Sequence, residues 1–384
     1  MGAMTTPLSD LLARIGRTAA LPFDAARTLP AGAYTEPQFT AHEVERLFRR
    51  DWVCVGRIDE IPNPGDYIAH RIAEAPVAVV RQTDGSLKAL SNVCRHRMSE
   101  LLKGIGHVGK IVCPYHAWSY DLSGRLLMAP FMGEHFDKRG IALKELRSDT
   151  WEGWIYVTAN ADVAPVSERL ASLSRRIADY RMDRHVMVYR ADEVWACNWK
   201  TLAENFTESY HLFSSHKHSL EPFTPTAGVW CEPGDEGWNI HWMDTSRPQE
   251  RVWAETPEPA LLTFPLMHVY PSHVVSVSFN RGFWMSLQPD GPDRVKVLWG
   301  VTAPKELVPV EPEARAAYDA DTKRVFDAVN LEDRTIVESI ARGLKSPLAE
   351  PGRLGEKERT LWEFWRFLAK ALGAPVPVQT SVAR

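Results

Sequence analysis

The chain has 384 residues, which is enough for one large domain or two of ordinary size. It is 45% hydrophobic and 24% charged, and its net charge of −4 comes without a basic block or an acidic tail, so no nucleic-acid partner is expected. No apolar run approaches the ~18 residues of a membrane span, and residues 1–30 lack the apolar core of a secretory signal. Five cysteines do not suggest a disulfide framework, so we expect a cytoplasmic protein without membrane contact.

The first half of the chain is predicted to form a small all-β domain. Residues 1–40 are rich in Pro and Ala and are expected to form an N-terminal arm, and a short amphipathic helix follows from Ala41. Strand-like runs then alternate with turn signals as far as about Val157. These runs are WVCVG, YIAHRI, VAVVRQ, LKALSNV, KIVC and GWIYVTA. We place this domain at residues 41–160.

The second half, residues 161–384, is predicted to combine helices with an antiparallel sheet. The expected helices are 167–185, 196–219, about 311–344 and about 356–372. The helix 196–219 is expected to carry polar residues inward. Residues 266–303 alternate between apolar and polar positions, as antiparallel strands do. The whole chain is therefore predicted to belong to the α+β class.

Two cysteines and two histidines occur close together in the first half. Cys94 and His96 form a Cys-x-His pair, and after sixteen residues Cys113 and His116 form a Cys-x-x-His pair. Each pair fits in one tight loop, and a hairpin between them can bring the two loops together. Such a donor set suits either a tetrahedral zinc ion or a [2Fe–2S] centre with cysteines on one iron and histidines on the other. The spacing alone does not distinguish a zinc site from a [2Fe–2S] centre.

A second group of metal-binding residue types lies in the predicted helix 196–219. Glu208 and His211 are three residues apart and share a face of an ideal helix, whereas His216 diverges from His211 by about 140°. The two histidines can share a metal ion only if the helix ends or bulges between them, and Ser214-Ser215 is the expected place. His218 lies two turns from His211 and is expected to be a surface residue.

A carboxylate for the same site is expected in the C-terminal helix 311–344. Asp333 extends the apolar row of that helix and is expected to point inward, whereas its neighbour Glu332 is expected to point elsewhere. Two histidines and one carboxylate form the facial triad of non-haem Fe(II) oxygenases, which leaves positions open for O₂ and substrate. His211, His216 and Asp333 are therefore the candidate ligands.

The motifs around these residues resemble those of the Rieske non-haem iron oxygenases, specifically their terminal oxygenase (alpha) subunit. The matching segments are NVCRHR, CPYHAWSYDLSGRL, Asn-Trp-Lys, Glu-Asn-Phe, Tyr-His and the Glu-Asp before Arg334. The resemblance spans about residues 45–370. It implies a Rieske [2Fe–2S] cluster and a mononuclear Fe(II) ion, with O₂ as co-substrate. The implied cluster ligands are Cys94 and Cys113 on one iron and His96 and His116 on the other, and the implied ligands of the mononuclear iron are His211, His216 and Asp333.

The resemblance also implies a domain order. An N-terminal arm at 1–40 precedes an all-β Rieske domain at 41–160. The catalytic domain at 161–384 is expected to contain a twisted antiparallel sheet with surrounding helices, of the helix-grip type.

The resemblance further implies how electrons arrive. In the family an acid on the ligand helix links the mononuclear iron to the Rieske centre of a neighbouring subunit, and Glu208 holds that position here. We therefore expect a homotrimer. No dinucleotide-binding motif or second cluster is apparent, so a separate NAD(P)H-dependent flavin or iron–sulfur reductase is the expected partner.

The sequence also carries features that bear on the substrate. Glutamate at position 208, where most relatives have aspartate, resembles the branch that oxidises glycine betaine, carnitine or stachydrine. Segments 227–253 and 264–288 are rich in aromatic residues that could surround a methylated ammonium group, with His241, His268 or Arg281 near a carboxylate. The first hypothesis is hydroxylation or N-demethylation of a small quaternary ammonium compound. Alternatives are aromatic-ring hydroxylation, aromatic O- or N-demethylation, a non-catalytic Rieske electron carrier, and a structural zinc protein.

Overall fold

The computed structural model describes residues 6–375, which divide into two compact units. One unit comprises residues 48–171, and the other joins residues up to 47 with those from 172 onward. The unit 48–171 is therefore inserted between two segments of the chain that fold together as the other unit. No helix among the described residues has both the length and the apolar character needed to cross a membrane.

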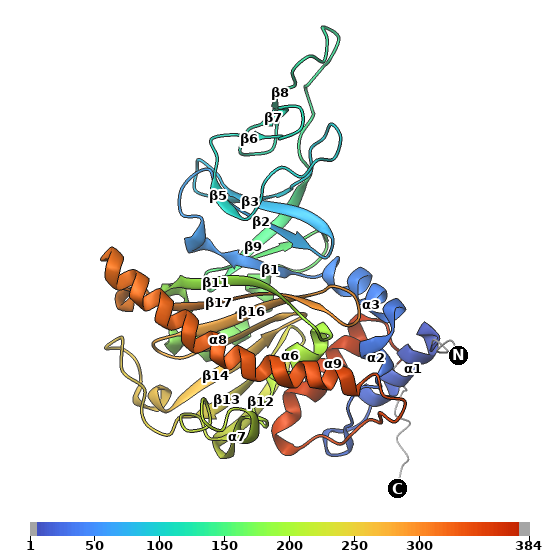
Figure 1. The fold of residues 1–384 in the computed structure, drawn as a ribbon, viewed down its shortest axis with the longest axis vertical. Coiled ribbons are helices and arrows are strands. Elements are labelled where there is room, and N and C mark those ends of the chain that lie inside the picture. Colours follow the sequence, from blue (N-terminus) through green and yellow to red (C-terminus); the bar gives the residue numbers. More distant parts are fainter. Residues whose placement is uncertain (1–5, 376–384) are drawn as a thin grey trace. The chain divides into compact units, whose positions relative to one another are not determined.

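The unit 48–171 is built almost entirely from antiparallel strands (Figure 1). Its strands are β1 (Val53–Arg57), β2 (Asp66–Ile72), β3 (Ala75–Arg81), β4 (Leu87–Ser91), β5 (Ile105–His107), β6 (Ile111–Val112), β7 (Ser119–Tyr120), β8 (Leu126–Met128), β9 (Glu145–Trp151) and β10 (Trp154–Thr158). Within the described part of the chain, seven of them form a sheet in the order β1-β10-β9-β4-β3-β2-β5, and β6-β7-β8 form a small second sheet. The apolar runs in β3 and β10 are buried because β-branched and aromatic side chains pack well on a pleated surface.

The other unit contains a second antiparallel sheet, which the helices accompany. Its strands are β11 (His185–Trp195), β12 (Val229–Asp235), β13 (Trp238–Asp244), β14 (Thr263–Val269), β15 (His273–Val277), β16 (Gly282–Pro289) and β17 (Val295–Pro304). Over residues 6–375 their order is β11-β17-β16-β15-β14-β13-β12. The expected α+β class, with an all-β domain first and an antiparallel sheet with helices second, is confirmed.

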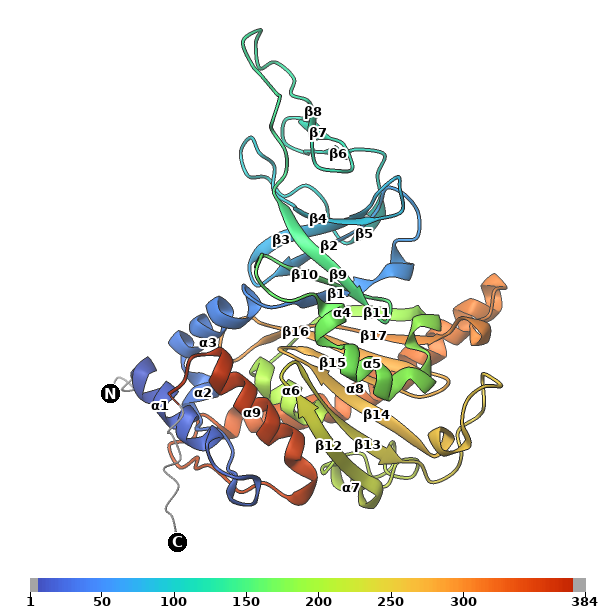
Figure 2. The same ribbon diagram turned by 180° about the vertical axis from the view of Figure 1, so that it is seen from behind.

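One helix of this second unit, α6 (Trp199–Thr207), leads directly into the segment that contains Glu208, His211 and His216. The α-helices of residues 6–375 are α1 (Leu8–Ala19), α2 (Gly32–Thr35), α3 (Pro37–Glu43), α4 (Val166–Arg169), α5 (Ala171–Ile177), α6 (Trp199–Thr207), α7 (Leu212–Ser215), α8 (Pro312–Gly343) and α9 (Arg359–Ala371). Helix α6 packs on β14, β15 and β16, and it also contacts both α8 and α9. Figures 1 and 2 show these two helices, orange and red, beside α6.

The N-terminus of α6 is fixed by a buried polar cluster. The Asn198 side chain caps the helix by accepting from the backbone N–H of Lys200 at 3.0 Å. The ammonium group of Lys200 lies 2.8 Å from the carboxylate of Glu43, and both side chains are fully buried. Removing one partner of such a pair costs about 3–5 kcal/mol because the other charge is left uncompensated. The pair therefore anchors the helix that leads to the candidate site.

The predicted N-terminal arm is largely helical. Helix α1 buries Leu11, Ile15 and Ala19, which recur every four residues and so form one face of the helix. It packs against α9, whose buried positions follow the same spacing. The sequence reading missed α1 because its apolar residues stand among Pro, Ala and Thr, which gave the segment the composition of a loop.

Candidate functional site

The two cysteine loops of the unit 48–171 have the same backbone design. In the first, the N–H of Met98 donates to the carbonyl of Cys94 at 3.1 Å, and in the second, the N–H of Ala117 donates to the carbonyl of Cys113 at 3.1 Å. Met98 and Ala117 both have positive φ, at 56° and 57°. This conformation costs about 1–3 kcal/mol in a residue with a side chain and persists where the surroundings impose it. Both loops are therefore tight turns of one form.

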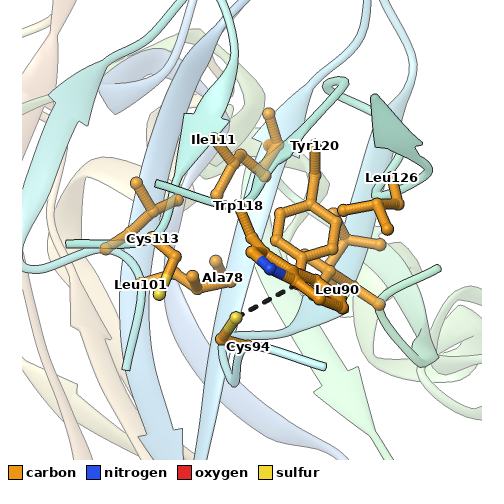
Figure 3. Close-up of a cluster of buried hydrophobic side chains, with 12 residues drawn as sticks. Ala78, Leu90, Cys94, Leu101, Ile111, Cys113, Trp118, Tyr120 and Leu126 are labelled. Carbon is orange, nitrogen blue, oxygen red and sulfur yellow. Dashed lines mark hydrogen bonds between the residues drawn. The ribbon is translucent and has the colours of Figure 1, made fainter. Parts of the chain in front are cut away.

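The four predicted donors lie where these loops meet. Cys94 and Cys113 are 2% and 3% exposed within a cluster of apolar side chains (Figure 3). His96 is half-buried and His116 exposed, and their ring centroids are 4.8 Å apart. The hydroxyl of Tyr120 accepts from the N–H of Arg95 at 3.0 Å and lies 3.2 Å from the Cys94 sulfur, to which it can donate.

The chemistry of these donors fits a two-iron cluster. Burial raises the pKa of the Cys113 thiol, but the backbone N–H groups of Tyr115 and His116 outweigh it and lower that pKa, which favours the thiolate that iron binds. The Nδ1 atom of His96 is buried without a hydrogen-bond partner among the described residues, as a ligand atom would be. Between residues 6 and 375, only His211, His216 and Asp333 bring three or more such ligand atoms within 4.8 Å of one another.

In the other unit, the structure brings together all three residues of the candidate triad. The Nε2 atoms of His216 and His211 lie 2.9 Å and 3.5 Å from the same oxygen, Oδ1 of Asp333. The two imidazole centroids are 5.1 Å apart. The side chains of His211 and Asp333 are 16% and 15% exposed and that of His216 is 1% exposed, so the group is largely shielded from water.

The predicted helix 196–219 is broken twice, once at the expected place and once before it. Helix α6 ends at Thr207, and Glu208 is extended, with φ −124° and ψ 150°. His211 and His216 flank the single turn α7, which ends at Ser215, so the expected interruption at Ser214-Ser215 is present in addition to the earlier break. Glu208 therefore reaches His211 across a break in the helix and not along a common helical face.

Side-chain bonds explain why the helix breaks there. The Glu208 carboxylate accepts from the backbone N–H groups of Tyr210 and His211, which competes with helical hydrogen bonding. Ser209 is fully buried, and its hydroxyl is hydrogen-bonded to Nε2 of His241 on β13 at 2.7 Å. The break thus rests on contacts with a strand that is distant in sequence, and it directs His211 towards Asp333.

Each imidazole of the triad has a carboxylate on its other nitrogen. Oε1 of Glu208 lies 2.5 Å from Nδ1 of His211, and Oε2 of Glu332 lies 2.7 Å from Nδ1 of His216. The expectation that Glu332 points elsewhere is therefore wrong. Adjacent residues on a helix diverge by about 100°, but the His216 ring lies between Glu332 and Asp333 and is reached by both.

Asn205 is a further polar contact of the site, to which the sequence analysis assigned no function. Its side-chain N–H donates to Oδ1 of Asp333 at 2.9 Å. The spacing of three residues to Glu208 was the signal that could have identified it. The bond helps to fix the carboxylate oxygen on which both histidines converge.

The charges of this group favour a bound cation. Burial lowers the pKa of His211, but the Glu208 and Asp333 carboxylates outweigh it and raise that pKa to about 10. Burial likewise lowers the pKa of His216, but the Asp333 and Glu332 carboxylates outweigh this effect, so the pKa is raised. For Asp333, burial raises the pKa, while the two histidines lower it well below its usual range. Three carboxylates around two imidazoles leave excess negative charge, which a divalent ion with nitrogen and oxygen ligands would compensate.

The aromatic residues predicted to surround a substrate separate into different parts of the unit. Phe283 stacks on Phe206 of α6 and Phe326 of α8, with centroids 5.5 Å and 5.4 Å apart, so it lies beside the helix that precedes His211 and the helix that carries Asp333. Tyr270, by contrast, stacks on Phe367 at 4.4 Å and so packs against α9, a helix that carries none of the triad residues. Of these two aromatic residues, therefore, only Phe283 lies where it can contact a substrate at the triad.

The predicted carboxylate-binding side chains are engaged elsewhere. His241 is bonded to Ser209, and His268 is bonded through Nε2 to the carbonyl of Pro271 at 2.8 Å. Burial lowers the pKa of each histidine to about 3, so both are neutral. The Arg281 guanidinium lies 4.3 Å from the centroid of the Tyr318 ring. None of these contacts brings a positive charge to the triad.

Comparison with known proteins gives matches to both units. Residues 51–147 match the family described as Rieske [2Fe-2S] domain, and residues 171–374 match the catalytic domain of the ring hydroxylating alpha subunit. The glycine betaine monooxygenase oxygenase subunit of Chromohalobacter salexigens is 29% identical over 366 residues, 85% of this chain and 81% of that protein. The chloroplastic choline monooxygenase of Arabidopsis thaliana is 28% identical over 375 residues, 90% of this chain and 82% of that protein.

Among solved structures, a quaternary ammonium Rieske monooxygenase matches with a TM-score of 0.79. The match covers 96% of this chain and 100% of that one, at 24% sequence identity. That structure is described as giving insight into carnitine oxidation by gut microbiota and inter-subunit electron transfer. At this identity the likeness concerns the fold.

Proposed function

Because the chain belongs to the ring-hydroxylating oxygenase alpha subunits, with their Rieske domain, it is an oxidoreductase, and we propose that it oxidises a small quaternary ammonium compound. Enzymes of this kind use a Rieske [2Fe–2S] cluster and a mononuclear iron ion, and so does this chain. The single observation that carries the proposal is the convergence of His211, His216 and Asp333 within 4.8 Å, in a chain whose matched relatives act on glycine betaine and choline.

The residues would divide between the two metal groups as follows. Cys94 and Cys113 would hold one cluster iron and His96 and His116 the other, while His211, His216 and Asp333 would hold the mononuclear iron. When bound, the cluster supplies single electrons and the ferrous ion activates O₂. The chain itself holds both imidazoles with Nε2 towards Asp333, keeps them in place through Glu208 and Glu332, and limits the access of water by burial.

Glu208 is proposed to connect the iron site with the electron donor. Its carboxylate holds Nδ1 of His211, and its side chain is 12% exposed, so one edge of it remains available to a neighbour. We assign it as the link to the Rieske histidines of a neighbouring copy, which requires an oligomer, most simply a homotrimer. A separate NAD(P)H-dependent reductase would supply the electrons.

The substrate class is supported by the relatives and by the rings beside the triad. Phe283 stacks on both Phe206 and Phe326 close to the helices of the site, and aromatic faces attract a methylated ammonium group. Hydroxylation of one N-methyl group would consume O₂, two electrons from the donor and two protons, and would give water and a hydroxymethyl ammonium. That product would then release formaldehyde and a proton and leave the amine demethylated.

A substrate panel tests this proposal directly. The holoenzyme with a reductase and NAD(P)H is expected to form formaldehyde, or a hydroxylated product, from at least one of glycine betaine, choline, carnitine and stachydrine. Methoxy- and N-methyl-aromatic compounds should give little product. Turnover of the aromatic compounds alone, measured by formaldehyde release and mass spectrometry, would replace the proposal with the alternative of aromatic oxidation.

The Rieske assignment makes a separate prediction about Tyr120. Its hydroxyl can donate to the Cys94 sulfur, and such a bond stabilises the extra negative charge of the reduced cluster. Tyr120→Phe is therefore expected to lower the reduction potential by on the order of tens of millivolts, as the loss of one hydrogen bond worth about 1 kcal/mol implies. Redox titration followed by visible circular dichroism measures it. An unchanged potential would show that the hydroxyl does not bond a cluster ligand.

A further inference from the structure

Glu332 is the second acid beside the triad, and its contact with Nδ1 of His216 determines which nitrogen of that ring carries the proton. Its Oε2 is 2.7 Å from His216 Nδ1, while Oδ1 of Asp333 is 2.9 Å from Nε2 of the same ring. The two carboxylates therefore occupy the two nitrogens of one imidazole. Since Nδ1 donates to Glu332, the lone pair of the neutral ring is at Nε2, which faces Asp333 and His211.

Glu332 is itself held in place by a serine. The hydroxyl of Ser219 donates to Oε2 of Glu332 at 2.5 Å, and the N–H of Ser219 donates to the carbonyl of His216 at 3.1 Å. The turn that follows α7 thus closes a small ring of contacts through His216, Glu332 and Ser219. His216 is 1% exposed, so its ring can adopt another orientation only if these contacts break.

We propose that Glu332 is a positioning residue that sets the affinity of the mononuclear iron through His216. The proposal rests on the proposed assignment of His211, His216 and Asp333 as iron ligands. Glu332 acts on the nitrogen that faces away from the triad, so it touches neither iron nor substrate. It fixes the ring orientation and tautomer and, through its charge, raises the basicity of the ligand. Loss of such a partner typically weakens metal binding about 10–100-fold.

Glu208 and Glu332 each hold the Nδ1 atom of one triad histidine, but we assign them different roles. Glu208 holds His211 and is proposed to carry electrons to the site. Glu332 holds His216, and its side chain is 36% exposed, bonded to a serine of the same unit. Replacing Glu332 should therefore affect how long iron stays bound, with little effect on the rate once iron is present.

The test compares iron binding in four forms of the holoenzyme. Glu332→Gln removes the charge but leaves an oxygen that can accept, Glu332→Asp shortens the reach, and Ser219→Ala removes only the serine contact. Glu338→Gln, on the same helix but bonded to Arg334 and the N–H of Ala196, is the control. The ferrous dissociation constant and the rate of iron loss to a chelator are measured anaerobically, with the visible spectrum of the cluster and Tm as checks on folding.

We expect Glu332→Gln and Glu332→Asp to weaken ferrous binding about 10–100-fold, Ser219→Ala to weaken it less, and Glu338→Gln to leave it unchanged. Saturating ferrous salt should restore kcat in Glu332→Gln without changing KM for the substrate. Iron binding as tight as in the wild type, in both Glu332→Gln and Ser219→Ala, would overturn the inference, and so would a kcat that excess iron does not restore. If the wild type itself binds no mononuclear iron, both the proposed iron site and the role of Glu332 are refuted.

Discussion

His211→Ala is expected to abolish product formation while the red-brown cluster remains intact. Residues that only support a metal ligand cost about 10–100-fold when they are lost, so removal of a ligand should exceed that range. The mutated side chain lies in the unit that carries the triad, whereas Cys94 and Cys113 lie in the other unit. The cluster absorbance, the iron content and the product are measured on the same preparation.

His218→Ala is the matched control for this experiment. His218 belongs to the same segment but is exposed, as the sequence predicted, and it is outside the group of three ligand atoms within 4.8 Å. We expect His218→Ala to retain full activity and iron content. Turnover retained by His211→Ala would show that His211 does not hold the catalytic metal, and activity lost in both variants would point to a structural effect on this segment.

Glu208→Gln is expected to slow oxidation of the reduced cluster by O₂ in the presence of substrate. The variant keeps the length of the side chain, so His211 can still find an acceptor, but the charge that would connect His211 to a neighbouring cluster is lost. We expect a slowing of at least about 10–100-fold, the range seen when a partner of a metal-ligating histidine is removed. Stopped-flow absorbance of the cluster under single-turnover conditions gives this rate.

Glu332→Gln is the informative comparison for Glu208→Gln. Both changes remove a carboxylate from Nδ1 of a triad histidine, but only Glu208 is proposed to carry electrons. With iron saturated, Glu332→Gln should oxidise its cluster at close to the wild-type rate. Equal rates in Glu208→Gln and the wild type would exclude the assigned path, and equal slowing in both variants would mean that the effect arises from iron binding.

The candidate cluster ligands could be recognised from the sequence because the members of each pair are close together in the chain. Cys-x-His and Cys-x-x-His each fit one turn, and the structure shows both as the same tight loop. The inward position of Asp333 followed from the apolar row of α8, which the structure describes as one helix from Pro312 to Gly343. Periodicity reports which way a residue faces, so it could identify this carboxylate across more than a hundred intervening residues.

The break between α6 and α7 could not be predicted in the same way. It depends on the bond from Ser209 to His241 and on the side chain of Glu208 accepting from the backbone. Local periodicity favours one continuous helix and contains no information about β13. The orientation of Glu332 was missed for a related reason, since its partner His216 reaches it only after that break.

Strand β11 was missed because its sequence lacks a clear apolar alternation. It forms one edge of the described sheet, and only His185, Val188 and Trp195 of its eleven residues are buried. Strands β16 and β17 were recognised, and they are almost wholly buried. Sequence patterns therefore identified these two strongly buried strands and missed the edge strand β11, whose pairing depends on the neighbouring strand.

X-ray diffraction at the iron absorption edge, on crystals of the holoenzyme, would test the central assignment most directly. We predict two adjacent iron peaks between the loops of Cys94 and Cys113, with histidine nitrogens on one of them, and a third, isolated peak bonded to His211, His216 and Asp333. A single peak at the zinc edge between the cysteine loops, or no metal peak beside Asp333 in active crystals, would contradict it.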